Sequence, residues 1–525
     1  MKIILLDSLR REGAEIALPL IQLIALSLLL HLLTCFASIG FYQPDEHFQI
    51  LEFAHYKMGN GPAEDLPWEF HEQIRPCLQP TLAMFFFSGL QWLGIQNPFT
   101  WNLLLKIITS CLAFGSLLLV ALHYSPQLKT QSSRRLLWLS SLFLWFMPYL
   151  HIRFTGENIS GILFIAAVLL LLRFPLQSLR TKRWPELAAG ALLGLAFYLR
   201  FQMGFALAGM GLWLLFVQRR SWASITRLAL GFSLMIALNI GVDYWFYGDW
   251  VISPYNYFYA NIIEDKAAGF GVSPWYDYLP QFLLGAAPPL SLLLLFLFGW
   301  GAWQKRQSIW VWSCIPFLLG HMLVGHKELR FLFPMLYLFP VLLAQGWEAF
   351  NKRYQSGKWK RWLGYFFIAQ NIVLLLIFTF PPIHRLLDYN EYFMKALYQN
   401  TERNSAQTTL LSREGSPYNT LKLMMNYYVH PQLQWKSFDS DEALLTWLEK
   451  QEELDHLLFY KEGFEWPEAE AGFEFEAAYR MFPDWMQQYN PYDWQEKVPI
   501  KNLYWIKRSD AATLSALPHS EAGAN

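Results

Sequence analysis

Charged residues are scarce in this chain of 525 residues, since Asp, Glu, Lys and Arg together make up 16%, against about a quarter in soluble domains. Basic and acidic residues balance at 41 each, so no net positive charge indicates a nucleic-acid partner. The four cysteines show no Cys-x-x-Cys spacing, and the twelve histidines show no His-Glu-x-x-His motif. These absences argue against a disulfide framework, a thiolate metal site and a dedicated zinc site. We therefore expect neither a metal nor a cofactor.

Long apolar runs take the place of the missing charge. Hydrophobic residues make up 54% of the chain, and repeated runs of roughly 18–22 residues predict membrane-spanning helices. The first run, about 17–39, follows Arg10 and Arg11 and lacks a small-residue cleavage site, so we interpret it as a signal anchor. The later apolar segments are 78–95, 101–123, 136–151, 158–174, 186–199, 203–217, 226–246, 280–303, 309–324, 331–348 and 362–380.

Segment 78–95 decides the expected topology, because it carries Pro80 and Gln91 and ends at Asn97-Pro98. If it lies re-entrant or at the interface, most basic loop residues fall on one side of the membrane, and the positive-inside rule makes that side cytoplasmic. We therefore predict about 11 full spans, with the amino terminus cytoplasmic and the carboxyl terminus external. The external side would be the periplasmic face of a bacterial inner membrane or the lumenal face of the endoplasmic reticulum.

The composition turns polar at about His384. We divide the chain into a transmembrane domain (1–383) with external loops at 40–77 and 247–279, an external domain (384–508) and a disordered tail (509–525). In the external domain, residues 417–430, 441–451 and 472–480 are expected to be helical, and 433–438 and 455–460 to be strands. The fold class is thus mainly α, a multi-pass transmembrane helical bundle with a small external α/β C-terminal domain.

Four ionisable residues stand together between two apolar segments in His326-Lys327-Glu328-Leu329-Arg330. Charge next to hydrocarbon is costly, so it usually marks a site. In a helix, His326, Lys327 and Arg330 would share one side. Cations clustered at a membrane boundary suit an anionic lipid head group or a phosphate leaving group. The alternative is a juxtamembrane anchor.

The first external loop opens with an acidic stretch that has the signals of a helix. Pro44 suits the first helical position, and Gly59 and Gly61 would end the helix. Asp45 and Glu46 lie in the first turn, where the helix dipole favours their ionised forms. An ionised carboxylate at the membrane surface can accept a proton from a sugar hydroxyl. A solvated helix cap is the alternative.

Further residues of this loop suit carbohydrate. Gln49 and Glu52 follow Asp45 along one face of the expected helix. Aromatic rings stack on the C–H faces of sugars while carboxylates accept hydrogen bonds from hydroxyls, which favours Trp68 and Glu69. Interfacial tryptophan is also common without any ligand.

Polar residues also interrupt the external side elsewhere. Arg153, Glu157 and Asn158 form one polar notch. Arg200 and Gln202 interrupt an apolar hairpin, although snorkelling explains both features equally well. The loop 247–279 is too polar to span a membrane and too aromatic for a passive linker. It could bind sugar, cover a site or pack at the interface.

Taken in order, these segments resemble the lipid-phosphomannose-dependent mannosyltransferases of the GPI-anchor and N-glycan pathways, multi-spanning enzymes of the GT-C class. The resemblance covers about residues 15–430 and is greatest to the enzyme that adds the third mannose of the GPI anchor. It rests on the motifs Pro44-Asp45-Glu46-His47-Phe48-Gln49, Trp68-Glu69-Phe70 with Arg75, Asp243…Phe246-Tyr247-Gly248…Trp250, Pro254…Asn256, Pro274-Trp275-Tyr276 and His326-Lys327-Glu328…Arg330-Phe331.

The resemblance implies an inverting transfer of mannose from a polyprenyl- or dolichyl-phosphate-linked donor to a hydroxyl of a glycan or glycolipid. It implies Asp45 as the base, with Glu46 as second choice, and donor-phosphate contacts that we expect from His326, Lys327, Arg330 and Arg200. The expected contacts to sugar or acceptor are His47, Gln49, Glu52, Trp68, Glu69, Arg75, Tyr247, Asn256, Trp275 and Glu328.

The expected partners are therefore a lipid-linked sugar donor, a glycan or glycolipid acceptor and membrane lipid. Three alternatives stay open. They are a GT-C transferase for another lipid-phosphate sugar, a lipid-linked sugar transporter, and a non-catalytic subunit of a glycan-assembly complex.

Overall fold

The computed structural model describes residues 14–173, 184–354, 358–381, 384, 388–404, 407–465, 467, 472–489 and 500–509. The chain forms two compact units. The first comprises residues 1–59, 67–96 and 100–381, and the second residues 60–66, 97–99 and 382–525. Arg10, Arg11 and the expected tail from residue 510 onward lie outside the described residues.

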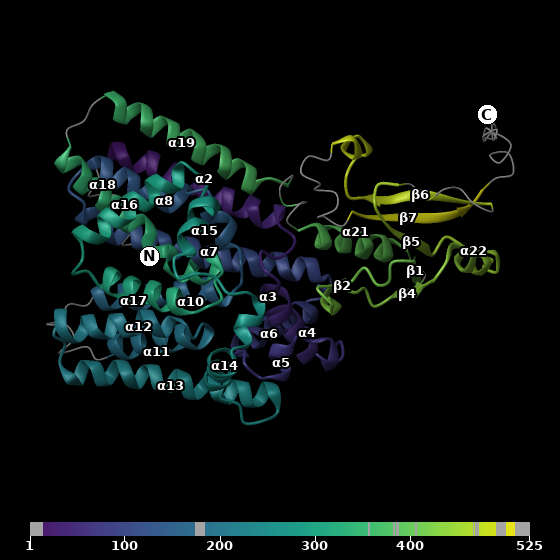
Figure 1. Cartoon of the computed structure of the whole chain (residues 1–525), viewed down its shortest axis with the longest axis horizontal. Coiled ribbons are helices and arrows are strands. Elements are labelled where there is room, and N and C mark those ends of the chain that lie inside the picture. Colours follow the sequence, from purple (N-terminus) through teal and green to yellow (C-terminus); the bar gives the residue numbers. More distant parts are fainter. Residues whose placement is uncertain are drawn as a thin grey trace. The chain divides into compact units, whose positions relative to one another are not determined.

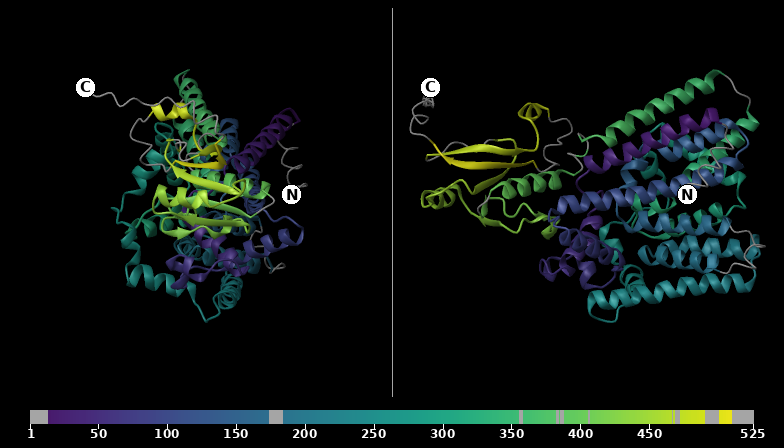
Figure 2. Two further views of the ribbon diagram at one scale, coloured as in Figure 1. Left: turned by 90° about the vertical axis from the view of Figure 1, so that its right-hand side faces the viewer. Right: turned by 180° about the vertical axis from the view of Figure 1, so that it is seen from behind.

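The first unit is a bundle of apolar helices. Of its described helices, six are long and apolar enough to cross a membrane: α2 (Ala14–Ala37), α7 (Pro98–Tyr124), α10 (Gly156–Arg173), α13 (Trp222–Tyr247), the 3-10 helix η8 (Leu329–Leu338) continuing into α18 (Phe339–Arg353), and α19 (Lys358–Thr379). Four shorter apolar helices join them: α11 (Trp184–Leu199), α12 (Met203–Leu212) with the π-turn η5 (Trp213–Val217), α16 (Leu290–Gln304) and α17 (Ile309–Leu323). Many of these helices run in similar directions, with α19 and α13 at opposite edges of the unit (Figures 1 and 2). The predicted multi-pass helical fold is confirmed, while the count of about 11 spans stays a prediction.

Two apolar segments that we predicted as single spans are interrupted. Segment 136–151 is divided into α8 (Gln131–Phe143) and α9 (Phe146–His151), and segment 280–303 into α15 (Tyr278–Gly285) and α16. Segment 331–348 stays continuous, because η8 passes directly into α18. Proline accounts for both interruptions, because it lacks an N–H and its ring clashes with the preceding turn. The prolines are Pro148, Pro288 and Pro289.

Two neighbouring polar residues of α19 satisfy backbone groups that these interruptions release. Asn371 accepts from the Trp145 N–H at 3.1 Å and donates to the Phe143 carbonyl at 2.7 Å. Gln370 donates to the carbonyls of Ala287 and Pro288 at 3.1 and 3.0 Å. Non-helical backbone at membrane depth is tolerated only with such partners. The polar pair therefore explains how broken helices are accommodated in an apolar bundle.

The first loop forms the helix that we predicted from Pro44, and it ends at Gly59 and Gly61, whose φ angles are +89° and +75°. It is built from α3 (Pro44–Glu46), the π-turn η1 (His47–Leu51) and α4 (Glu52–Lys57). A π-turn adds a residue to one turn, so the polar face expected from regular spacing is not continuous. After it come η2 (Ala63–Asp65), α5 (Trp68–His71) and α6 (Leu78–Trp92).

The loop at 247–279 and the remaining short elements complete this unit. The loop contains α14 (Ser253–Phe258), the π-turn η6 (Tyr259–Ile263) and the 3-10 helix η7 (Lys266–Phe270). The short 3-10 helix η3 (Ser125–Gln127) follows α7.

The second unit is a small α/β domain, as expected. Its sheet has the order β4-β1-β5-β7-β6, in which β4, β1 and β5 are parallel and β7 is antiparallel to both neighbours; its strands lie in one layer (Figure 2). The strands are β1 (Thr408–Ser412), β4 (Leu433–Ser437), β5 (Leu457–Glu462), β6 (Phe473–Arg480) and β7 (Lys501–Arg508), with the hairpin β2 (Asn419–Thr420) and β3 (Leu423–Met424). The helices are α21 (Tyr389–Arg403) and α22 (Asp441–Glu449), with 3-10 turns η9 (Asn426–Tyr428) and η10 (Asp484–Gln488).

Two of the helices predicted for this domain are wrong. Residues 472–480 form strand β6, in which large and charged side chains alternate with the period of two that is typical of a strand. Residues 417–430 hold a hairpin whose two central residues, Leu421 and Lys422, have φ angles of +55° and +64°, the backbone of a tight β-turn. The predicted helix at 441–451 and strands at 433–438 and 455–460 are confirmed as α22, β4 and β5.

Candidate active site

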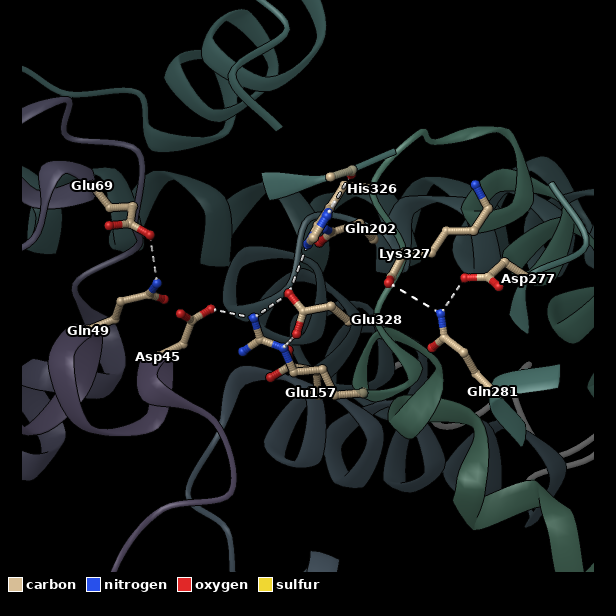
Figure 3. Close-up of polar contacts among 12 residues, drawn as sticks. Asp45, Gln49, Glu69, Glu157, Gln202, Asp277, Gln281, His326, Lys327 and Glu328 are labelled. Carbon is tan, nitrogen blue, oxygen red and sulfur yellow. Dashed lines mark hydrogen bonds and ion pairs between the residues drawn. The ribbon is translucent and has the colours of Figure 1, made fainter. Parts of the chain in front are cut away.

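The acidic first loop and the charged motif at 326–330 meet in the structure. Arg330 Nη2 lies 2.8 Å from Asp45 Oδ2, and the labelled Asp45 points toward the 326–330 segment in Figure 3. The two residues are 285 positions apart in the chain, so only the fold brings them together. Burial alone would raise the pKa of the Asp45 carboxyl, but Arg330 and then Arg75 more than offset this, and its pKa lies below the usual value.

Glu328 orients the arginine that contacts Asp45. Arg330 Nε donates to Glu328 Oε2 at 2.7 Å, and Arg330 Nη2 donates to Glu328 Oε1 at 3.0 Å. His326 Nε2 lies 3.0 Å from Glu328 Oε1, and His326 Nδ1 lies 3.1 Å from the Gly271 carbonyl. A bidentate contact of this kind between a guanidinium group and a carboxylate fixes the plane of the guanidinium group. The remaining donors of Arg330 are therefore aimed at the side where Asp45 lies.

A second carboxylate and a second arginine lie on the other side of Asp45. Arg75 Nη2 is 3.7 Å from Asp45 Oδ2 and 3.5 Å from Glu69 Oε1. Gln49 Nε2 donates to Glu69 Oε1 at 3.0 Å, a contact drawn in Figure 3. Burial raises the pKa of the Glu69 carboxyl, although the charge of Arg75 opposes it. Two neighbouring carboxylates thus have pKa values shifted in opposite directions.

Arg200 and Glu157 add a buried ion pair. Arg200 Nη2 lies 3.3 Å from Glu157 Oε1, and the Arg200 guanidinium stacks 4.7 Å above the Phe331 ring. Arg200 is 7% exposed, and its Nε finds no hydrogen-bond partner among the described residues. A buried donor without a partner is costly unless a ligand supplies the acceptor. Arg200 is therefore well suited to bind an anion.

These groups surround two cavities that share Asp45, Arg75, Arg200 and Arg330. The larger, the cleft, has a volume of about 370 Å³. Its polar residues include Trp68, Glu69, Gln202, Tyr257, Asn261, His321, His326 and Glu328, and its apolar wall includes Phe197, Phe201, Phe205, Phe258, Ile262 and Phe331. The smaller, the side pocket, has a volume of about 50 Å³ and is lined also by Glu46, Gln49, Gln79, Thr155 and Glu157.

The cleft brings together eight of the predicted site residues: Asp45, Trp68, Glu69, Arg75, Arg200, His326, Glu328 and Arg330. Gln49 lines the side pocket. Glu46 also reaches the side pocket but not the cleft. It is 7% exposed, lies 3.7 Å from Arg153 and accepts from the Tyr42 N–H at 3.1 Å. Of the two adjacent acids, Asp45 is the one that faces both cavities.

The structure places Lys327 away from the cleft lining. Its ammonium group donates to the carbonyls of Val324 and Ser273 at 2.5 and 3.0 Å, and in Figure 3 its side chain points away from His326 and Glu328. The segment is not an α-helix at this point, since η8 begins only at Leu329, so the cations do not share one helical face. Direct contact between Lys327 and a phosphate therefore has no support from this geometry.

Five expected sugar contacts also lie outside both linings. His47 and Glu52 form a buried pair, with Nε2 and Oε1 2.7 Å apart. Tyr247 donates to the Arg75 carbonyl at 2.8 Å, and Asn256 donates to the Gln73 carbonyl at 3.4 Å. Trp275 is exposed and lies against Tyr276. The first four hold the loops together and reach the site only through neighbours.

Several lining residues were not predicted as site residues, among them Glu157, Gln202, Tyr257 and His321. The first two carried a signal, because polar residues interrupted apolar sequence there. Tyr257 and His321 carried none, since one lies in a loop with many aromatics and the other within an apolar helix. Among the described residues, no group of three or more His, Cys, Asp or Glu is arranged to hold a metal.

Comparison with known proteins shows the family of this chain. The Alg9-like mannosyltransferase family matches residues 22–432. The chain belongs to this family. Among curated relatives, GPI mannosyltransferase 3 of Yarrowia lipolytica is 27% identical over 362 residues, which cover 67% of this chain and 66% of the relative. Human GPI alpha-1,2-mannosyltransferase 3 is 26% identical over 459 residues, which cover 84% of this chain and 78% of the relative.

A solved structure shows the same fold. It is the crystal structure of ArnT from Cupriavidus metallidurans bound to undecaprenyl phosphate, with 12% identity and a TM-score of 0.50, covering 92% of this chain and 97% of that chain. This member of the Alg9-like family is thus an integral multi-pass membrane mannosyltransferase of GT-C architecture.

Proposed function

We propose that this enzyme transfers mannose from a polyprenyl- or dolichyl-phosphate-linked donor to a hydroxyl of a glycolipid of the GPI-precursor type, with inversion at the anomeric carbon. The observation that carries the proposal is the position of Asp45, which lies where the cleft and the side pocket meet and contacts Arg330 at 2.8 Å. The names of the relatives support mannose and the glycolipid acceptor.

The cleft suits a lipid-phosphate donor. Its apolar wall matches an isoprenoid chain, and pockets with a few convergent polar groups are typical of ligand sites. Three arginines and three carboxylates line it (Arg75, Arg200, Arg330; Asp45, Glu69, Glu328), so it has little net charge when all are ionised. Burial raises the pKa of Glu69, so this carboxyl takes up a proton more readily than Asp45 or Glu328, whose pKa values are lowered by Arg330.

The side pocket suits the acceptor sugar. It is lined by carboxylates and side-chain amides, including Glu46, Gln49, Gln79 and Glu157. Carboxylates accept hydrogen bonds from hydroxyls, while amides both donate and accept. An acceptor hydroxyl bound here would approach Asp45 from a different cavity than the donor.

The chemistry follows from this arrangement. Asp45 takes the proton of the acceptor hydroxyl as the hydroxyl oxygen bonds to the anomeric carbon. The bond between that carbon and the phosphate oxygen breaks, and its electron pair leaves with the lipid phosphate, which Arg330 and Arg200 stabilise. The phosphate competes with Asp45 for Arg330, and loss of that partner raises the affinity of Asp45 for a proton when it must act as a base. A single displacement inverts the configuration.

The basic residues of the opposite loops support an external position for this site, by the positive-inside rule. The family shown by the comparisons favours a transferase over a transporter. Two adjacent cavities that share one carboxylate also match a two-substrate reaction.

The test is product analysis with the purified enzyme in lipid. Dolichyl-phosphate mannose, the same lipid phosphate carrying glucose, and GDP-mannose are supplied separately with a GPI-type glycolipid that carries two mannoses. We expect transfer of one mannose from the first donor only, detected by mass spectrometry, with the linkage read by α-mannosidase digestion. The Asp45→Asn variant is the blank. Transfer from GDP-mannose without any lipid donor would contradict the proposal, as would full transfer by Asp45→Asn.

A further inference from the structure

Asp243 is a fully buried carboxylate at the external end of α13 that does not line either cavity. It accepts three hydrogen bonds, from the Cys77 N–H at 2.8 Å, from the Tyr198 hydroxyl at 2.6 Å and from the Ser253 hydroxyl at 2.5 Å. Among the described residues no Lys, Arg or His forms an ion pair with it. An ionisable residue within a membrane helix is costly and usually serves a function.

Each donor to Asp243 belongs to a segment that carries a residue of the cleft. Cys77 follows Arg75 by two positions, and Tyr198 precedes Arg200 by two positions at the end of α11. Ser253 begins α14, which carries Tyr257 one turn later. One carboxylate therefore connects three segments that come from different parts of the chain, and each of them contributes to the wall around Asp45.

Further contacts close this network around Arg75. Tyr247, one turn after Asp243 on α13, donates to the Arg75 carbonyl at 2.8 Å. The Arg75 guanidinium lies 5.7 Å from the centre of the Tyr257 ring, and Gln202 donates to the Tyr257 hydroxyl at 2.6 Å. Tyr247 thus holds the backbone of Arg75. The Arg75 side chain lies against the Tyr257 ring, whose hydroxyl is held by Gln202.

A carboxylate is the residue type that can satisfy these three donors at once. An ionised Asp is an acceptor only, with two oxygens and about four lone-pair positions. Asparagine offers only one oxygen to these donors. In one orientation its NH2 group would face the Cys77 N–H, which cannot accept a hydrogen bond. In the other it would face the Tyr198 and Ser253 hydroxyls, which can rotate to accept. Burying a carboxyl group without an opposite charge is costly unless hydrogen bonds compensate. A carboxyl group at this position therefore indicates that the geometry of its three hydrogen bonds matters.

We infer that Asp243 is a positioning residue for the transfer reaction, which sets the guanidinium groups of Arg75 and Arg200 around Asp45 and the donor phosphate. The inference rests on the proposed function. Misplacement of a reacting group by about 1 Å can cost about 100-fold in rate. Removal of the Asp243 carboxylate should therefore lower kcat although it touches no substrate.

The test compares Asp243→Ala and Asp243→Asn with Asp249→Asn, an exposed acid six positions later. We expect kcat/KM to fall by about 10- to 100-fold for Ala, by several-fold less for Asn, and not at all for Asp249→Asn. The loss should appear in kcat more than in the KM for the acceptor. Thermal unfolding and gel filtration in detergent report whether each variant is folded.

A background variant separates positioning from a general structural role. If Asp243 acts through Arg75, the effect of Asp243→Asn on kcat/KM should be several-fold smaller when Arg75 is already Ala. Effects that simply multiply in the two backgrounds would overturn the inference, as would full activity of a folded Asp243→Ala.

Two milder variants serve if Asp243→Ala does not fold. Tyr198→Phe and Ser253→Ala each remove one donor to the carboxylate, and each should lower kcat by a few-fold. The activity of the wild type separates a failure of the proposed function from a failure of the inference about Asp243. If the wild type transfers no mannose from lipid-phosphate mannose, the proposed function fails. If it does and the variants match it, only this inference fails.

Discussion

The Asp45–Arg330 contact predicts how the reaction depends on pH. Replacing Arg330 by Gln removes the nearer of the two positive charges beside Asp45, at 2.8 Å against 3.7 Å for Arg75. A neighbouring arginine lowers an Asp pKa by about 1–3 units, and each unit corresponds to about 1.4 kcal/mol. With Arg330 absent, burial acts against less opposition, and we expect the pKa of Asp45 to rise.

The sign of the effect follows from the proposed role of Asp45 as a base. In the wild type the lowered pKa keeps the carboxylate ionised, so activity persists into acid and is lost only as the pH falls through that low pKa. In Arg330→Gln the loss should begin at a higher pH. The variant should also lose about 10²- to 10³-fold in kcat/KM because the leaving phosphate loses a donor. The residual activity is measurable with radiolabelled mannose on the lipid donor.

The assay is the pH profile of kcat/KM in detergent at limiting acceptor. Arg330→Lys, which keeps the charge, should show a smaller shift of the acid limb than Arg330→Gln. Glu69→Gln identifies the carboxylate that titrates, because Glu69 also lies beside Arg75. An acid limb that stays in place in Arg330→Gln would refute the reasoning. An acid limb that disappears in Glu69→Gln would assign the base to Glu69 instead.

Three further outcomes follow from the same geometry. Asp45→Asn should lower kcat by about 10²- to 10⁴-fold. Glu46→Gln, which changes the adjacent acid that faces Arg153, should keep most of kcat. Equal losses in both variants would contradict the assignment of the base. Lys327→Met should lower thermal stability and leave the KM for the donor nearly unchanged, because the ammonium group binds backbone carbonyls and does not line the cleft. A rise of tenfold or more in the donor KM, with a normal unfolding temperature, would instead support direct contact between Lys327 and the phosphate. Glu52→Leu should destabilise the fold by about 3–5 kcal/mol by removing the buried carboxylate that pairs with His47. Urea unfolding should detect this loss. Unchanged stability with a lost kcat would place Glu52 in the reaction.

Much of the membrane unit was predictable because its signals are local. Long apolar runs indicate membrane helices whatever surrounds them, and the helix from Pro44 to Gly59 was marked by its own start and stop residues. The breaks in segments 136–151 and 280–303 were not foreseen. They depend on Gln370 and Asn371, which supply partners from a helix far along the chain.

In the second unit, local preference was misleading where tertiary pairing decided the outcome. Residues 472–480 contain Glu and Ala, which favour helices, yet they form β6 because β7 pairs with them along their length. Strand β7 itself, Lys501–Arg508, gave no strong signal against the polar sequence around it.

The sequence by itself determined the multi-pass membrane class of the protein through its long apolar runs. It also marked Asp45 and Arg330 as candidate site residues, because charge beside hydrocarbon is costly wherever the fold puts it. Only the tertiary structure decided which neighbours of these residues take part. A side chain's direction depends on partners distant in the chain, so Asp45 faces Arg330 while Glu46 faces Arg153, and Arg330 reaches the cleft while Lys327 holds backbone carbonyls.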